Sequence, residues 1–593
     1  MSPAANPFRL SDYFWPFGVS LLCGCASLYL ASHALFALGI SLAPWHGVAF
    51  VSMALAGGFF AMEGAPRARV KKIFALLGFE LFLCGILAGT ASRFDDLTVD
   101  GMNVRIEPTI NLMAGWNPVL DPHFSSRKQL AGEKIFLKGG YNHDPTSCFT
   151  LSGYLALLTG QINAGKAVTP ILGLAAFGIA FGGLLVFGLP RGWTTALAAL
   201  AALNPVVIYQ SSCFYVDGHV AACFTMVVFG GLRVVRAGKP GIETAVFFLS
   251  LLLLAGAKLS GFFYGGILFL LFFAIWAARF LRNFRILSLG LLLFAAGCGL
   301  LFLAKMKGGF GGLTSLTREK IREGTSYADG IIGYKEWAPG LGRGGDPGRL
   351  EVFFNAHFSP SAILANEPVR WKFPFWLTRP ELAIFEDLSP QPYVGGFGPL
   401  YGAYFALSAL SLILLRKKPP LLSWVPLVAS FGSIYFSQIW WARWTPQAWL
   451  IPLGFLLPVV CSLQSRPNGR AWWLPFLGVF AGTLNSALIL AFYTSGCLQA
   501  QRILQCQLDF LHALPQPLQI HFLREGGVPL YRSNRIWLIR ENLDFVATEE
   551  PLPRPRMKFH RSTTTVALPP DWRARLNNAK EEKLFRKSRL LEE

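Results

Sequence analysis

The sequence predicts an all-α polytopic membrane protein with about thirteen transmembrane helices, large extracytoplasmic loops and a small α+β region at the C-terminus. Of its 593 residues, 53% are hydrophobic and only 15% are charged, and the mean hydropathy is +0.44. Soluble proteins carry roughly 25% charged residues. The apolar residues form runs whose length approaches the roughly 20 residues that cross a bilayer, and basic residues lie in the short loops between many of them.

The apolar runs give thirteen candidate spans. They cover residues 14–42, 48–62, 70–91, 169–189, 194–211, 218–232, 244–257, 261–278, 286–304, 397–415, 421–437, 446–461 and 472–494. The first run follows one arginine, Arg9, and is too long for the apolar core of a secretion signal, so we expect it to be retained as a span.

The basic residues set the expected orientation. Most short loops that carry them fall on one side if the chain alternates across the membrane; these residues are Arg67, Arg69, Lys71, Lys72, Arg191, Arg233, Arg236, Lys239, Arg279, Arg282, Arg285, Arg416, Lys417, Lys418, Arg466 and Arg470. The positive-inside rule places them, and the N-terminus, in the cytoplasm. This bias also accounts for much of the net charge of +20, and because no nucleic-acid-binding motif is present we exclude nucleic acid as a partner.

This orientation divides the chain into a transmembrane domain, residues 1–495, and an extracytoplasmic C-terminal region, residues 496–593. Two large outer loops are expected, at 92–168 and 305–396, and the protein is expected in the plasma (inner) membrane of a bacterium. The apolar stretch 148–160 is only about two-thirds of a span. We expect it to lie along the outer face, because a crossing there would invert every later basic loop.

The ten cysteines indicate no metal framework, since most lie in or beside apolar runs, where cysteine behaves as a small hydrophobe. Cys497 and Cys506 lie beyond the last predicted span. A disulfide between them is an open alternative that a nine-residue helical spacing disfavours.

Three aspartates, Asp95, Asp96 and Asp100, follow the third predicted span within a few residues. Acidic side chains at a membrane boundary are costly unless they are solvated or used. A carboxylate can deprotonate a sugar hydroxyl or bind a divalent metal ion. We interpret the three as catalytic candidates, with Asp100 favoured as general base. The alternative is a solvated helix exit. A cofactor of the Mg or Mn type remains open, but no metal ligand is assigned because no Asp-x-Asp spacing occurs.

Two cations are candidates for binding a phosphate. Lys258 lies between two apolar runs, and Arg443 lies among tryptophans in the sequence WWARWTPQAWLIP. An isolated cation at that depth needs an anionic partner, and an arginine fork matches phosphate oxygens. The alternatives are a lysine that extends to the interface and an ordinary interfacial aromatic belt.

Two further motifs are substrate-binding candidates. Asp217 begins a predicted span, where an acid also serves as an ordinary helix cap. His143 and Asp144 lie in the sequence YNHDP before the stretch 148–160, where the alternative is a turn that ends at an Asp-Pro helix start.

The first outer loop resembles that of the GT-C superfamily of membrane glycosyltransferases, in particular the protein O-mannosyltransferases and lipid A aminoarabinose transferases. The resemblance rests on Asp100 just past a span and on the Gly-Trp-Asn-Pro sequence at 115–118. Val104 and Arg105 stand where those families often have Tyr-His, which makes Arg105 a substrate-binding candidate. The YNHDP sequence is similar to an element at the same place in those families.

The resemblance implies an inverting hexosyl or pentosyl transferase of the cell envelope, whose donor is a polyprenyl-phosphate-linked sugar and whose acceptor is an extracytoplasmic glycan, lipid or protein. Two alternatives remain: a transporter or flippase of a lipid-linked substrate, and a non-catalytic envelope-assembly protein. The near absence of ionisable residues in mid-span and of an internal repeat disfavours transport.

Overall fold

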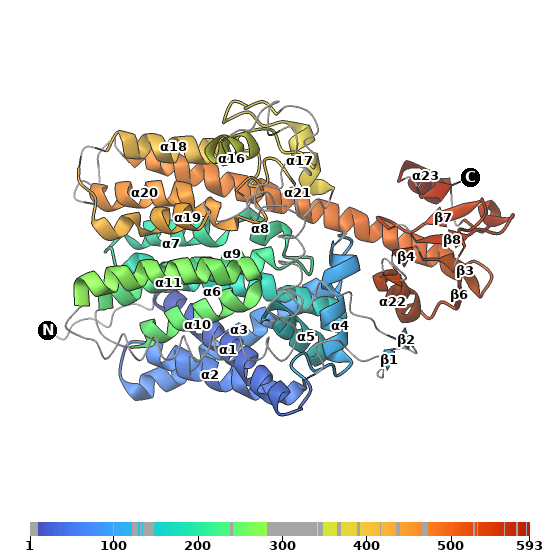
Figure 1. The fold of residues 1–593 in the computed structure, drawn as a ribbon, viewed down its shortest axis with the longest axis horizontal. Coiled ribbons are helices and arrows are strands. Elements are labelled where there is room, and N and C mark those ends of the chain that lie inside the picture. The colour runs from blue at the N-terminus through green and yellow to red at the C-terminus, as the bar shows by residue number, and fades with distance from the viewer. Residues whose placement is uncertain are drawn as a thin grey trace, which may run out of the picture.

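The computed structural model describes most of the chain. The described residues are 10–98, 100–120, 129–130, 133–134, 147–237, 241–280, 341, 348–363, 369–387, 392–415, 417–434, 439–464, 472–522, 524–525, 528–529, 532–548, 550–562, 564–576, 579–588 and 590–592. They form a bundle of helices with a separate C-terminal region at one end of it (Figure 1).

Most of the bundle is made of apolar helices. Its α-helices are α1 (Phe14–Ala37), α2 (Gly47–Ala61), α3 (Pro66–Ser92), α4 (Glu107–Met113), α5 (Ser147–Thr159), α6 (Val168–Leu185), α7 (Arg191–Ala202), α8 (Pro205–Tyr209), α9 (Asp217–Ala237), α10 (Ile242–Ala257), α11 (Leu259–Phe280), α16 (Arg349–His357), α17 (Arg379–Glu386), α18 (Tyr401–Ile413), α19 (Val425–Ile434), α20 (Leu450–Leu463) and α21 (Trp473–His512). A π-helix, η3 (Gly101–Arg105), follows the three aspartates, and 3₁₀ turns η5 (Ile162–Ala167) and η8 (Pro446–Trp449) precede α6 and α20.

Seven described helical segments are long and apolar enough to cross a membrane. They are Leu10–Ala37, Pro44–Ala61, Pro66–Ser92, Ile162–Leu185, Asp217–Ala237, Pro446–Leu463 and Trp473–His512. Five apolar helices are shorter, namely Ser147–Thr159, Ile242–Ala257, Ser260–Trp276, Tyr401–Ile413 and Leu421–Ile434. The composition and these helices make the chain an integral membrane protein. The predicted span 286–304 lies outside the described residues.

The predicted span 194–211 is two helices rather than one. The chain leaves α7 at Leu203 and begins α8 at Pro205, where the side chain of Asn204 caps the new helix by accepting a hydrogen bond from the Val206 amide, 3.0 Å away. Proline fits the first turn of a helix because its missing N–H has no partner to lose there. The break brings the end of α8 and the following turn toward the start of α9.

Glycine lets α1 and α6 pack closely. A Cβ atom on Gly178 of α6 would lie 2.4 Å from the carbonyl oxygen of Phe14, and one on Gly18 of α1 would lie 2.7 Å from the amide nitrogen of Ile179. Small residues permit this close approach of the two backbones. Such packing is important between membrane helices, because the hydrophobic effect does not drive their association within the bilayer. α6 also packs on α9, which places the start of α9 inside the bundle.

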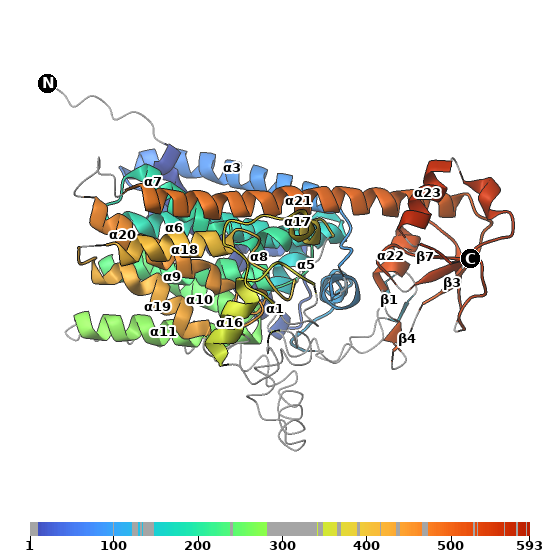
Figure 2. The same cartoon turned by 90° about the horizontal axis from the view of Figure 1, so that it is seen from above.

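α21 joins the bundle to the C-terminal region. The apolar run predicted a span that ends at residue 494, but the helix runs without a break from Trp473 to His512, a length of 40 residues (Figure 2). The predicted boundary at residue 495 therefore falls inside a helix. Cys497 and Cys506 both lie on α21, and neither is part of a disulfide.

The C-terminal region contains a small five-stranded sheet, in agreement with the predicted small α+β region. Its strand order is β6-β3-β8-β7-β9, from β3 (Leu518–His521), β6 (Phe545–Thr548), β7 (Arg556–Lys558), β8 (Thr565–Ala567) and β9 (Leu591–Glu592). β6 runs parallel to β3, and the other neighbours are antiparallel. The helices α22 (Arg532–Arg540) and α23 (Ala579–Lys587) accompany it.

Candidate functional site

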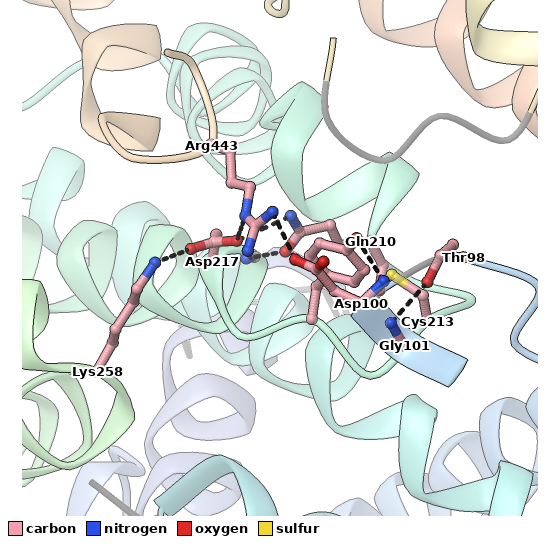
Figure 3. Close-up of polar contacts among 10 residues, drawn as sticks. Thr98, Asp100, Gly101, Gln210, Cys213, Asp217, Lys258 and Arg443 are labelled. Carbon is pink, nitrogen blue, oxygen red and sulfur yellow. Dashed lines mark hydrogen bonds and ion pairs between the residues drawn. The ribbon is translucent and has the colours of Figure 1, made fainter. Parts of the chain in front are cut away.

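Four charged residues that the sequence singled out separately meet in one cluster (Figure 3). Asp100 directly precedes η3, Asp217 begins α9, Lys258 follows α10, and Arg443 lies in the loop before η8. Each therefore sits where a helix begins or ends. Because they contact one another, these helix ends all lie at one end of the bundle, which we call the site end.

Asp217 is the buried centre of the cluster. Its side chain is 2% exposed and accepts hydrogen bonds from Lys258 Nζ at 2.8 Å, from Arg443 Nε at 2.7 Å and from Gln210 Nε2 at 3.2 Å. Gln210 also accepts a hydrogen bond from the Gly218 amide at 2.7 Å. A carboxylate in the first turn of α9 is favoured by the helix dipole, and the two cations compensate its burial.

Arg443 bridges the two aspartates. Its Nη1 lies 2.9 Å from Asp100 Oδ2, while its Nε binds Asp217. The guanidinium also lies over the rings of Tyr215 and Trp441, at 4.5 and 5.2 Å from their centroids. Burial alone would lower the pKa of Arg443, but the Asp217, Tyr215 and Asp100 groups more than offset this and raise it. The guanidinium is therefore charged at any physiological pH.

Asp100 is the accessible acid of the cluster. Its side chain is 33% exposed, compared with 2% for Asp217. Its backbone amide donates to the hydroxyl of the buried Tyr215, at 3.3 Å. The lysine on the other side of Asp217 is shielded, because Lys258 Nζ lies 3.9 Å from the ring centroid of Trp444. A molecule that approaches the cluster from solvent therefore meets Asp100 before the buried charges.

Asp96 is buried and holds the backbone of its own loop. Its Oδ1 accepts from the Thr98 amide at 3.0 Å and from the Thr98 hydroxyl at 2.6 Å, and its Oδ2 accepts from the Phe214 amide at 2.7 Å. Burial raises the pKa of Asp96, and the Lys166 charge and these hydrogen bonds offset this only in part. A Cβ on Gly101 would lie 2.1 Å from Asp96 Oδ2, so the chain needs glycine there.

Asp95 faces away from the cluster toward the C-terminal region. Its carboxylate accepts hydrogen bonds from Asn163 of η5, Gln501 of α21 and Arg540 of α22. Burial acts to raise its pKa, but the hydrogen bond and charge of Arg540, the charge of Lys166 and the hydrogen bond from Asn163 leave it lowered. Asp95 and Asp96, predicted as catalytic candidates, are thus buried and bind other parts of the chain, whereas the Asp100 side chain is 33% exposed.

The remaining predicted site residues are placed only in part. Arg105 is half-buried on η3, which packs against α22. His143 and Asp144 lie outside the described residues. Within the described part of the chain, no group of three or more His, Cys, Asp or Glu side chains has the arrangement of a metal site.

Sequence reasoning missed three residues of the site. Gln210 contacts Asp217, and Tyr215 contacts Asp100. A glutamine or a tyrosine beside an apolar run is common, so the sequence does not mark either one as a site residue. Lys166 is buried and donates to the Phe94 carbonyl next to Asp95. It did carry a signal, because it lies between two apolar stretches just as Lys258 does.

No protein-family model and no curated protein sequence matches the chain. Among solved structures, it is similar to one described as ArnT from Cupriavidus metallidurans bound to undecaprenyl phosphate, with 11% sequence identity and a TM-score of 0.40. The similarity covers 79% of this chain and 90% of that one. A similarity at this level assigns the chain to no family, so the geometry of the site carries the functional conclusion.

Proposed function

We propose that the chain is a membrane glycosyltransferase that moves a sugar from a polyprenyl-phosphate carrier to a hydroxyl group of an extracytoplasmic acceptor. The observation that carries the proposal is the Asp100–Arg443–Asp217–Lys258 cluster at one end of a bundle of apolar helices. It combines an accessible carboxylate with a permanently charged guanidinium, the two groups that such a transfer needs, where a lipid chain can lie against the helices.

The proposed chemistry is a single displacement. The Asp100 carboxylate takes the proton of the acceptor hydroxyl, and the hydroxyl oxygen forms a bond to the anomeric carbon of the sugar. The bond between that carbon and the phosphate oxygen breaks, and the phosphate keeps the electron pair. Arg443 stabilises the negative charge on the leaving phosphate, which is the main electrostatic demand of the reaction. Attack opposite to the leaving group inverts the anomeric configuration.

The ion pair between Arg443 and Asp100 implies that the carrier phosphate binds before Asp100 acts on the acceptor. In the free protein, Arg443 Nη1 contacts Asp100 Oδ2 at 2.9 Å. A phosphate that binds Arg443 competes with Asp100 for that contact, and the displaced Asp100 Oδ2 can then accept a hydrogen bond from the acceptor hydroxyl. Asp217 and Lys258 remain paired and keep the guanidinium in place.

The test uses the full-length protein in nanodiscs, with binding of polyprenyl phosphate and transfer from a lipid-linked sugar measured separately. Asp100→Asn should keep carrier binding and lose transfer by about 100-fold or more, as expected for removal of a general base. Arg443→Ala should weaken carrier binding. Asp509→Asn, at an exposed position on α21, is the control and should change neither.

Two outcomes would contradict the proposal. Full transfer by Asp100→Asn would remove its base, and movement of the carrier across the membrane without transfer would favour a flippase. The sugar and acceptor are to be identified by mass spectrometry of envelope glycans and glycolipids with and without the protein. The proposed step uses no metal ion, and transfer measured in EDTA and after addition of Mg²⁺ or Mn²⁺ tests this.

A further inference from the structure

A second surface at the site end, built from other residues than the charged cluster, is unusually apolar. We define the aromatic segment as residues 370–379, between α16 and the start of α17, with the sequence RWKFPFWLTR. Within it, Trp371, Phe373, Phe375, Trp376 and Leu377 have exposed fractions of 60%, 65%, 50%, 64% and 40%. Five large exposed apolar side chains within seven residues of one loop are typical of a surface that binds a membrane or another molecule.

The aromatic segment is fixed to the site end of an apolar helix. The Lys372 amide donates to the Phe358 carbonyl at 3.0 Å, and the Trp371 indole donates to Asn355 of α16 at 2.8 Å. Pro374 lies beside Gly402 in the first turn of α18, 3.5 Å from the position of a Cβ there. Figures 1 and 2 both place α16 next to α18. The segment is therefore held in place, and its exposure is not that of a loose loop.

The length of α18 sets the depth of the aromatic segment. α18 has 13 residues and is therefore about 20 Å long, which is less than the roughly 30 Å of bilayer hydrocarbon. An apolar helix of this length fits inside the hydrocarbon, which places its first turn, the one that Pro374 contacts, inside that layer or at its border. The aromatic segment, packed at that turn, then lies at the border of the hydrocarbon with its apolar side chains exposed.

The charges of the aromatic segment follow the pattern of an interfacial anchor. Lys372 forms an ion pair with Glu381 of α17, and their side chains are only 10% and 2% exposed, so this charge is turned inward and neutralised. Arg370 and Arg379, at the two ends, are exposed. Tryptophan and phenylalanine between exposed arginines suit the boundary of a bilayer, where arginines reach lipid phosphates and aromatic rings enter the interface.

We propose that the aromatic segment is a membrane anchor, in which Trp371, Phe373, Phe375, Trp376 and Leu377 insert into the lipid leaflet at the site end while Arg370 and Arg379 bind lipid phosphates. The anchor fixes α16 and α17 against the bilayer beside α18. This inference does not depend on the proposed chemistry, since it uses none of the residues in the charged cluster.

The test places a photo-crosslinking amino acid, p-benzoylphenylalanine, at Phe373 of the full-length protein in nanodiscs of phosphatidylethanolamine and phosphatidylglycerol. Irradiation should yield a peptide whose mass has increased by one phospholipid. The same amino acid at Val546, on the edge strand β6 of the C-terminal region, is the matched control and should yield no lipid adduct, because Val546 is 52% exposed and thus of similar accessibility to Phe373 at 65%. An adduct at Phe373 to a second copy of the chain, or the absence of a lipid adduct, overturns the proposal.

A second measurement tests membrane insertion independently of crosslinking. Phe373→Asp should lower the unfolding temperature in nanodiscs by several degrees, because a carboxylate is costly in the membrane interface. At an exposed position in contact with water, a substitution of phenylalanine by aspartate would change the unfolding temperature little. Val546→Asp is the control and should leave the temperature unchanged. An unchanged temperature for Phe373→Asp also contradicts membrane insertion.

Discussion

Arg540 forms a bidentate ion pair with the Asp95 carboxylate, although the two residues are far apart in the chain. Arg540 Nη1 lies 3.0 Å from Asp95 Oδ1, and Nη2 lies 3.3 Å from Oδ2. The Asp95 backbone amide also donates to Gln501 at 2.9 Å. The C-terminal region is thereby tied to the loop that carries Asp100, and α22 packs against the π-helix that follows it.

Removal of the arginine should loosen this loop. Arg540→Ala should raise the rate of amide hydrogen exchange in residues 93–98 and 100–105 and lower the free energy of unfolding by about 1–2 kcal/mol, a modest value because Arg540 is partly exposed and solvent screens the pair. Arg540→Lys should restore only part of the protection, since lysine lacks the two-pronged geometry. Arg575→Ala, which breaks an exposed pair with Asp571, is the control and should leave the exchange of this loop unchanged.

The same ion pair should depend on pH in one direction. The pKa of Asp95 is lowered in the folded protein, so its contribution is complete above the ordinary aspartate pKa of about 3.9 and is lost as the pH falls through the lower folded value. The difference in unfolding free energy between the native chain and Asp95→Asn should be constant from pH 8 to pH 5 and shrink below about pH 4. A difference that already shrinks between pH 7 and pH 6 would contradict this assignment.

Asp217 should be the most sensitive acid for stability. Asp217→Asn leaves the buried Lys258 and Arg443 without their shared carboxylate, and we expect a loss of roughly 3–5 kcal/mol in unfolding free energy. The double variant Asp217→Asn with Lys258→Met removes one uncompensated charge and should be more stable than Asp217→Asn alone. Chemical unfolding of the three proteins in detergent measures this, and equal stability of the single and double variants would argue against coupling.

The glycine contact between α1 and α6 gives a prediction away from the site. Gly178→Ala should destabilise the protein by about 1–3 kcal/mol, because the added methyl group meets the backbone oxygen of Phe14 and forces the helices apart. Gly85→Ala on α3 has no atom within 4 Å of the new Cβ and should be neutral or stabilising. A similar unfolding temperature for the two variants would indicate that the helices are less closely packed than described.

Much of the fold follows from the sequence because hydropathy marks a bilayer-crossing helix directly. Each described candidate span corresponds to helical structure, including 194–211, where Asn204-Pro205 supplies an ordinary start signal for a second helix. The end of α21 was not predictable in this way. Its apolar character ends near Thr494, but the polar residues that follow are also good helix formers, and no proline interrupts the helix before His512.

The four residues of the charged cluster could be singled out from the sequence, but their pairing could not be predicted. Asp100, Asp217, Lys258 and Arg443 each stood out because an ionisable group at the end of an apolar run is unusual. Their pairing depends on which helix ends meet, and local sequence does not encode that. For the same reason, Asp95 and Asp96 looked equivalent in the sequence, yet one binds Arg540 and the other binds the Phe214 amide.

Because α21 is unbroken, the number of residues in it sets how the C-terminal region is rotated relative to the bundle. Its 40 residues form a rod about 60 Å long, in which each residue turns the helix by about 100°. Two residues inserted after Gln501 would rotate everything beyond them by roughly 200° and turn Arg540 away from Asp95. Seven inserted residues would restore the direction to within about 20° but displace the region by roughly 10 Å. The length of α21 thus determines whether Arg540 of the C-terminal region can reach Asp95 of the bundle.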